Sequence, residues 1–421
     1  MEHKIFARYP LGNKKRKWKQ ESFILSQFSA KATDMKKALL HCKEAGFNLL
    51  EIAWATHEQA EEAARLCDDL GVNILFQDMS RYGGMQENRK CDVSDLASVI
   101  EEKRGIRRIV GYYVWDEPYG DDEIGEARRL TDLCEELAPD LLPFSVAIPS
   151  YNPAYTWKNG RYVEYLEKYV TTIEPPMISL DYYPIGMAEQ NEEVQLDKTL
   201  MWCDLGLLRR LGDKYDMPIW FYYQGQNLNK AERFTFPMIR SMMYAGVLYG
   251  VKGLQHYTAV GAIINKEGEK ELFFEDQKMI HRELAALGDT LMALTCKRVI
   301  HDEGLAPDAP AFYEMHETYK DSAYLASPLP KRISVSEYED AYGNGYALIL
   351  NRDYETEQTV SLPLQGATRI YEVSKADGRQ RVIEEKAEAI CLTLAPGDAA
   401  LLRLQDAKDA PFTVEYKLCK E

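Results

Sequence analysis

Two adjacent carboxyl residues, Asp116 and Glu117, follow a run of uncharged residues from Ile109 to Trp115, and Pro118 comes directly after them. Such a run predicts a buried strand, whose pairing the proline ends. A carboxyl at the edge of an apolar, aromatic pocket loses hydration, so its pKa rises and it can protonate a leaving oxygen. We therefore predict a catalytic acid here, with Glu117 favoured over Asp116.

The alternation of side chains along a strand limits which of these two carboxyls can point to the inner face. Neighbouring side chains point to opposite faces, so only one of Asp116 and Glu117 can follow the inner face unless the strand has already ended.

The elements that position this pair form a repeat between residues 22 and 296. Short apolar runs alternate with amphipathic stretches that carry helix caps at the start or glycine after the end. The predicted strands are 23–28, 49–54, 73–77, 108–114, 142–148, 177–181, 218–223 and 253–257. The predicted helices are 33–45, 57–70, 92–102, 122–137, 161–172, 193–215, 237–249 and 275–294. This count and length predict an α/β fold, a (β/α)8 TIM barrel. A doubly wound sheet is the alternative, but the first strand ends in Gln27–Ala30, where a glycine-rich phosphate loop would stand.

Active sites of such barrels lie at the carboxyl ends of the strands. Those ends carry Glu51, Trp54, Asp78, Trp115, Asp116, Glu117, Asp181, Tyr183, Tyr222, Gln224, His256 and Tyr257. The set is acidic and aromatic, with one histidine and no cysteine, lysine or arginine. It disfavours phosphoryl substrates, thiol chemistry and histidine-rich zinc sites. We expect Glu117, Asp181, Gln224 and His256 to open into one pocket at the same mouth of the barrel.

The pattern of predicted elements changes after Leu294. Short alternating segments predict strands at 332–338, 346–351, 359–363, 368–373, 381–383, 389–394 and 399–404. Closely spaced short strands indicate an antiparallel β-sandwich. We therefore expect a catalytic barrel over 1–296 and a β-sandwich accessory domain over 297–421 that adds nothing to the catalytic centre.

Composition excludes several classes of partner. The chain has 421 residues with 51 Lys and Arg against 67 Asp and Glu, a net charge of −16 that argues against nucleic-acid binding. No segment approaches the ~20 apolar residues of a membrane span, and no signal peptide is visible. The eight scattered cysteines, without a Cys-x-x-Cys pair, predict reduced thiols in a cytoplasmic protein. The sequence leaves the oligomeric state open.

The end of the predicted fourth strand resembles the acid/base strand of clan A glycoside hydrolases, the β-galactosidase-like barrels. There an Asn-Glu or Asp-Glu pair, often followed by proline, ends strand four. Asp181-Tyr182-Tyr183-Pro184, the stretch 240–257 and the segment 394–398 also resemble uncharacterised bacterial members of that group. The resemblance implies a glycoside hydrolase with a carbohydrate substrate, Glu117 as general acid/base, and no cofactor or metal.

The predicted seventh strand departs from that group. Clan A enzymes end it with the nucleophilic glutamate, whereas Gln224 stands here and cannot be a nucleophile. Asp181 is the first candidate for the second carboxylate, with Asp78 and Glu51 behind it. The expected substrate-binding residues are Trp54, Asp78, Trp115, Tyr183, Tyr222, Gln224, His256 and Tyr257.

Three other functions stay open. The pair Asp116-Glu117 resembles that of substrate-assisted N-acetylhexosaminidases, which need no glutamate on strand seven. A barrel lacking its nucleophile could instead bind sugars without turnover. A metal-dependent sugar isomerase would need several carboxylate and histidine ligands on neighbouring strands, and His256 alone gives it little support.

Overall fold

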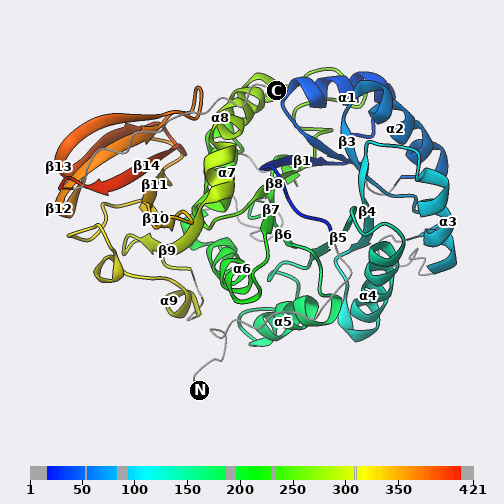
Figure 1. Ribbon diagram of the computed structural model, residues 1–421, viewed down its shortest axis with the longest axis horizontal. Helices are drawn as coiled ribbons and strands as arrows, with labels where there is room; N and C mark the ends of the chain where they lie inside the picture. The colour runs from blue at the N-terminus through cyan, green and yellow to red at the C-terminus, as the bar shows by residue number, and fades with distance from the viewer. Residues whose placement is uncertain are drawn as a thin grey trace.

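Eight parallel strands close into a barrel, each bonded to the next along the chain and β8 to β1. The computed structural model describes residues 17–52, 55–82, 93–185, 196–228, 233–307, 309 and 311–408. The barrel strands are β1 Ile24–Phe28, β2 Leu49–Glu51, β3 Asn73–Phe76, β4 Ile109–Asp116, β5 Leu142–Ala147, β6 Ile178–Tyr182, β7 Ile219–Gln224 and β8 Gly253–Tyr257. The barrel predicted from the sequence is confirmed (Figure 1).

Helices follow the strands and form an outer layer around the barrel (Figure 1). They are α1 Met35–Glu44, α2 His57–Leu70, α3 Val93–Lys103, α4 Gly120–Leu137, α5 Arg161–Ile173, the short η2 Leu196–Lys198, α6 Met201–Tyr215, α7 Phe236–Leu248 and α8 Phe274–Ala293. Local sequence sets their ends. At α2, for example, Thr56 and Gln59 form a capping box, and Gly71 closes the helix in the left-handed conformation.

The barrel has two apolar layers. The layer inside the barrel is aromatic and includes Phe28, Tyr113, Phe144, Trp220 and Tyr222. A larger cluster lies between the strands and the helices. Some residues of the inner layer, among them Phe28, Tyr113 and Tyr222, also line the cavity described below.

A six-stranded antiparallel sheet follows the barrel, in the order β13-β12-β14-β11-β10-β9. Its strands are β9 Thr295–His301, β10 Ile333–Glu339, β11 Gly345–Asn351, β12 Gln358–Val373, β13 Gln380–Leu394 and β14 Ala399–Asp406, with α9 Ala311–Met315 and η4 Tyr319–Asp321 between β9 and β10. The antiparallel β-domain predicted from the sequence is thus present, beside α7 in Figure 1.

Two details of the predicted strands were wrong. The segments 359–363 and 368–373 are one strand, β12, and 381–383 and 389–394 are one strand, β13. Register shifts between β12 and β13 let both strands continue through polar, exposed residues that look like turns in the sequence. Strand β9 was not predicted.

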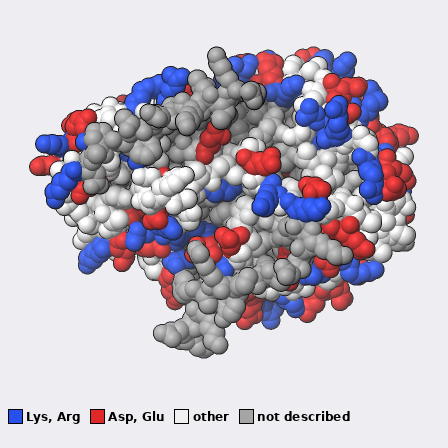
Figure 2. Space-filling model, viewed as in Figure 1, with Lys and Arg blue, Asp and Glu red and all other residues white. Residues whose placement is uncertain are grey.

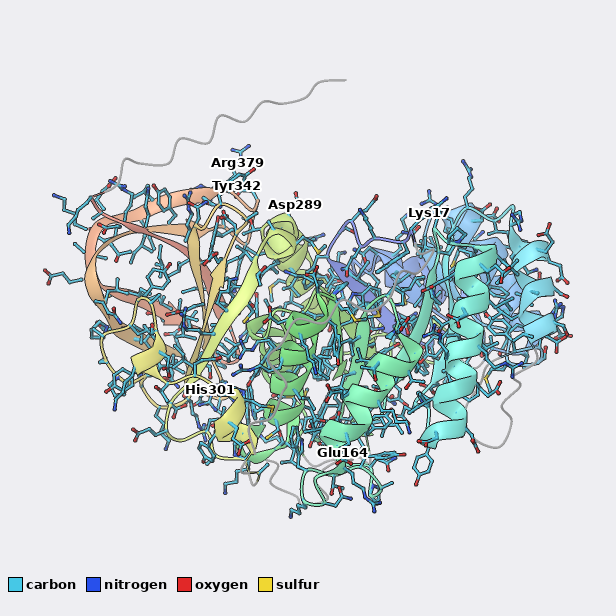
Figure 3. All side chains as sticks on the ribbon, turned by 60° about the horizontal axis from the view of Figure 1, so that its bottom comes forward. Lys17, Glu164, Asp289, His301, Tyr342 and Arg379 are labelled. Carbon is cyan, nitrogen blue, oxygen red and sulfur yellow. The ribbon has the colours of Figure 1, made fainter. Side chains whose placement is uncertain are left out.

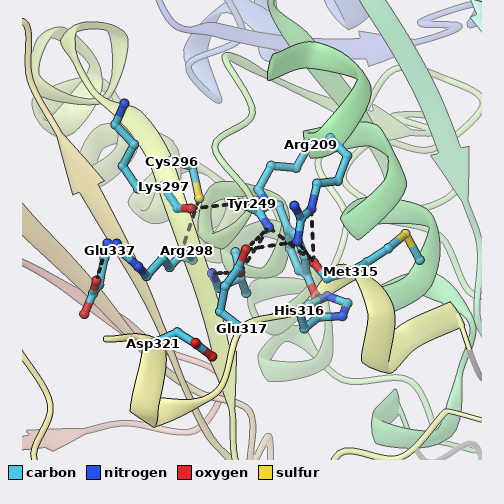
Figure 4. Close-up of polar contacts among 12 residues, drawn as sticks. Arg209, Tyr249, Cys296, Lys297, Arg298, Met315, His316, Glu317, Asp321 and Glu337 are labelled. Atoms are coloured by element: carbon cyan, nitrogen blue, oxygen red, sulfur yellow. Dashed lines mark hydrogen bonds and ion pairs between the residues drawn. The ribbon is translucent and has the colours of Figure 1, made fainter. Parts of the chain in front are cut away.

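Polar contacts tie the β-domain to the barrel. Arg209 and Arg210 of α6 both bind the Glu317 carboxylate at 3.0 Å, and the other oxygen of Glu317 accepts the Val299 amide (Figure 4). The segment 394–398 also packs on α7. Arg240 donates to the Pro396 carbonyl at 3.1 Å, and a Cβ on Gly397, whose φ is +69°, would lie 2.3 Å from the Pro237 carbonyl.

The surface carries both signs of charge. Lys and Arg side chains are interspersed with Asp and Glu over the face in Figure 2. Among the described residues, no helix is both long and apolar enough to span a bilayer. Cys42, Cys67, Cys134, Cys203, Cys296 and Cys391 are free thiols.

Candidate active site

The end of β4 brings both adjacent carboxyls to the barrel mouth. The register between β4 and β5 shifts between Tyr113 and Trp115, so Asp116 follows the inner face although Tyr113 lies inside three residues earlier. The strand then ends, and Glu117 adopts a left-handed φ of +48°. Few residues other than glycine take this conformation, which makes the turn a costly one that must be held by its surroundings. As a result, Asp116 and Glu117 both line the same cavity.

That cavity has a volume of about 320 Å³ and lies at the carboxyl ends of the strands. It is lined by Phe28, Tyr113, Asp116, Glu117, Val146, Pro149, Tyr151, Asn152, Pro153, Asp181, Tyr183, Tyr222 and Tyr257. Three carboxyls therefore face a space walled largely by aromatic rings. Such a space suits an uncharged ligand with many hydroxyl groups and apolar C–H faces.

Asp181 is the most buried of these carboxyls, with 5% of its surface exposed. Burial raises its pKa well above the ordinary value, and the neighbouring Glu117 and Asp116 raise it further, while a hydrogen bond from Tyr183 acts in the opposite direction. Within the described structure, its Oδ1 atom has no hydrogen-bond partner. A buried, unpartnered carboxyl oxygen is costly, and a bound ligand would satisfy it.

A polar layer under the cavity holds one of its walls in place. Glu51 is fully buried and accepts hydrogen bonds from Ser26 at 2.7 Å, Gln255 at 2.9 Å and the Tyr222 hydroxyl. Burial raises the pKa of Glu51 to about 7, and these three donors oppose that rise. Tyr113 similarly donates to Asp116 at 2.9 Å. The hydroxyl groups of Tyr222 and Tyr113 therefore each donate a hydrogen bond to a carboxyl group.

Aromatic contacts order the remaining walls. Tyr183 stacks on Tyr257, with ring centroids 4.4 Å apart and planes at 26°. Phe28 meets Tyr257 at 5.3 Å and Tyr222 at 6.2 Å. Tyr183, Tyr222 and Tyr257 were all predicted as substrate-binding residues, and all three line the cavity.

Two predicted site residues, Gln224 and His256, do not line it. The Gln224 side chain accepts from the Ile185 amide at 2.8 Å and donates to the Ile185 carbonyl at 2.7 Å, so it fastens the loop after β6. His256 lies on the outer face of β8, because Gln255 and Tyr257 on either side of it point inward. It contacts Phe47 and Tyr223, and burial lowers its pKa to about 3. The prediction that these two residues share the cavity with Glu117 and Asp181 is wrong.

Asp78 and Trp115 also lie elsewhere, contrary to the prediction. Asp78 accepts from Ser80 and bonds the His57 ring at 2.8 Å, so it builds the turn after β3. Trp115 packs in the layer between barrel and helices, because the register shift in β4 turns it outward. Trp54 lies outside the described residues. Among the described residues, no group of three or more His, Cys, Asp or Glu side chains could hold a metal ion.

Sequence reasoning missed the wall formed by the loop after β5. Pro149, Tyr151, Asn152 and Pro153 all belong to it. The available signal was a pair of prolines alternating with aromatic residues over 149–157, directly after a predicted strand. Phe28 and Tyr113, which read as ordinary core residues, were missed as well.

No protein-family model and none of the curated proteins matches the chain. Solved structures do resemble it. A β-L-arabinopyranosidase of glycoside hydrolase family 27 from Geobacillus stearothermophilus has a TM-score of 0.51 and 10% identity, over 97% of this chain and 98% of that one. A glucosidase from Croceicoccus marinus has a TM-score of 0.44 and 11% identity, over 94% and 97% of the two chains.

A family 2 β-galacturonidase from Eisenbergiella tayi, complexed with galacturonate, has a TM-score of 0.44 and 12% identity, over 63% of this chain and 52% of that one. The match therefore spans about half the length of the β-galacturonidase. At these identities the likeness is one of fold, and this chain shares its fold over nearly its whole length with the family 27 arabinopyranosidase.

Proposed function

We propose that this protein is a glycoside hydrolase in which Glu117 and Asp181 are the two catalytic carboxyls. One observation carries the proposal: both side chains line a single aromatic-walled cavity at the barrel mouth, and Asp181 is buried there with an unpartnered oxygen. In the two-carboxyl mechanism of glycoside hydrolysis, one carboxyl donates a proton and a second acts as base or nucleophile. The substrate in this proposal is a carbohydrate, with one sugar residue inside the cavity.

The positions of the two carboxyls suggest their roles. Glu117 is partly exposed, so it can donate its proton to a leaving group near the opening and recover one from solvent. Asp181 lies deeper and faces the sugar. The C–O bond to the leaving group breaks as Glu117 protonates its oxygen, and Asp181 either attacks the anomeric carbon or activates a water that does so.

The test compares two substrates of the same sugar, one with an activated aryl leaving group and one with a natural sugar leaving group. Glu117→Gln is expected to lower kcat/KM for the natural substrate by about 10²–10⁴ and to affect the aryl substrate much less, because the aryl group leaves without a proton. Asp181→Asn is expected to lower both rates together.

The two variants check each other. If Glu117→Gln lowers the rates of both substrates equally, and Asp181→Asn lowers mainly the rate of the natural substrate, then Asp181 is the acid and Glu117 the base or nucleophile. Unchanged turnover in Glu117→Gln would remove this residue from the chemistry. A wild-type protein that binds sugars but hydrolyses no glycoside in a broad panel would support a binding protein instead.

A second candidate rests on the position of Asp116. In a substrate-assisted N-acetylhexosaminidase, an aspartate beside the acid orients the acetamido group of the substrate, and Asp116 does line the cavity beside Glu117. Asp116→Asn separates the candidates. A rate loss confined to 2-acetamido sugars favours the substrate-assisted reaction, and turnover of sugars with a 2-hydroxyl favours the two-carboxyl reaction.

A further inference from the structure

The cavity is open to solvent along part of its rim. Most of its lining residues are buried, but Pro153 is exposed, and four others are partly exposed: Glu117, Tyr151, Asn152 and Tyr257. The opening is therefore bordered by the loops that follow β4 and β5 and by the end of β8. A volume of about 320 Å³ is near the lower end of the ~300–1,000 Å³ typical of ligand sites, so a substrate larger than one sugar must extend through this opening.

An exposed aromatic side chain follows the cavity lining closely in the sequence. Tyr119 leaves 51% of its surface in solvent, unlike the other tyrosines of the barrel mouth. It follows Glu117 by two residues, and Tyr155 follows Pro153 by two, which places both tyrosine backbones within about 7 Å of residues that line the cavity.

Neighbouring rings support Tyr119 from one side. Its ring centroid lies 5.5 Å from that of Tyr155, which in turn stacks on the buried Tyr165 at 4.4 Å. The Gly120 amide donates to the Tyr155 hydroxyl at 3.1 Å, and this bond ties the two loops together. One side of Tyr119 is thus packed, and the other is presented to solvent in a fixed position at low entropic cost.

Building on the proposed function, we infer that Tyr119, supported by Tyr155, is a binding subsite for the leaving-group part of the substrate. The chemistry it recognises is a flat face with apolar C–H or π character, which a pyranose ring and an aryl group both offer. Core packing accounts for Tyr155 and Tyr165, but it leaves half of Tyr119 in water. The subsite makes the protein selective for glycosides whose leaving group is a ring.

The experiment uses three substrates with the same sugar, chosen as the one that the wild-type protein hydrolyses fastest. Their leaving groups are fluoride, 4-nitrophenol and a second pyranose. Tyr119→Ala is expected to lower kcat/KM about 2- to 12-fold for the two ring-bearing substrates, mainly through KM, and to leave the glycosyl fluoride unchanged.

Two further variants serve as controls. Tyr119→Phe keeps the ring and is expected to behave like wild type. Tyr342→Ala removes a tyrosine that is 91% exposed on the β-domain (Figure 3) and is expected to change nothing. Equal loss on all three substrates, or no loss on any, overturns the subsite. Loss on only one ring-bearing substrate supports it and identifies whether aryl groups or sugars are preferred.

A separate measurement distinguishes this inference from the proposed function. If no glycoside is hydrolysed, the proposed function fails, and the subsite is tested with 4-nitrophenyl glycosides as ligands in saturation-transfer NMR. The aryl protons should receive saturation from the wild type and from Tyr119→Phe but much less from Tyr119→Ala. Equal saturation in all three proteins overturns the subsite.

Discussion

At the scale of single residues, Asp181 shows how surroundings decide chemistry. A carboxyl in water is ionised at neutral pH, but this one is buried beside two other carboxyls, and its pKa is raised well above the ordinary value. A base or nucleophile must be ionised to act. The proposed role of Asp181 therefore makes the protein's activity sensitive to acid.

The pH dependence of kcat/KM tests this. Asp181 is ionised only above its raised pKa, so activity should be lost as pH falls through that value, at a pH well above the ~3.9 of an ordinary aspartate. The measurement is a pH–rate profile with the activated aryl substrate, because proton donation by Glu117 matters little there. An acidic limb near pH 4 would contradict the proposed role.

Stability gives an independent control. Because the native state holds the Asp181 proton more tightly than the unfolded chain does, ionisation costs stability as pH rises from about 4 to the native pKa. Asp181→Asn lacks this cost. Its free energy of unfolding should therefore rise relative to wild type between pH 4 and pH 8, as measured in urea.

At the scale of elements, most strands and helices could be predicted from the sequence because their signals are local. The positions of His256 and Trp115 could not be read from strand ends alone. His256 required counting the alternation along β8, and Trp115 required knowledge of a register shift in β4 that arises only when β5 pairs with it. The cavity wall after β5 depends on how that loop folds over the barrel, which no repeat in the sequence encodes.

The bonds between Gln224 and the loop after β6 explain why an amide rather than a carboxylate suits the end of β7. Its amide group donates to the Ile185 and Gln226 carbonyls and accepts the Ile185 amide. A carboxylate could accept that amide hydrogen, but it would repel both carbonyls. The amide is therefore suited to a fastening role.

Gln224→Glu is accordingly expected to destabilise the protein by about 2–5 kcal/mol at pH 8, since the buried Ile185 carbonyl and the partly buried Gln226 carbonyl lose their donor. It should not increase turnover. Urea unfolding and steady-state kinetics measure the two effects, and Gln224→Met, which removes the same bonds without adding charge, should cost less. If Gln224→Glu is as stable as wild type and hydrolyses glycosides faster, position 224 belongs to the catalytic site.

At the scale of the whole molecule, the β-domain contacts the barrel and its described residues do not line the cavity. None of the described lining residues comes from beyond residue 296. Contacts between the domains instead reach the loops that surround the site. Arg352, at the end of β11, pairs with Asp197 in η2, which lies between β6 and α6, and with Asp302 after β9. The β-domain thus holds η2, which directly precedes α6.

Burial makes this ion pair sensitive to mutation. Arg352 is almost wholly buried, so Arg352→Met leaves Asp302, itself 6% exposed, and Asp197 without their shared cation. Removing one partner of a buried pair costs about 3–5 kcal/mol, and we expect a loss of this size in urea unfolding.

Arg233→Met is the matched control, since it breaks a solvent-exposed ion pair with Glu355 that also joins barrel to β-domain. Exposed pairs contribute only ~0–1 kcal/mol, so this variant should stay close to wild type. If both variants lowered the free energy of unfolding by the same amount, burial would not determine how strongly these ion pairs join the β-domain to the barrel.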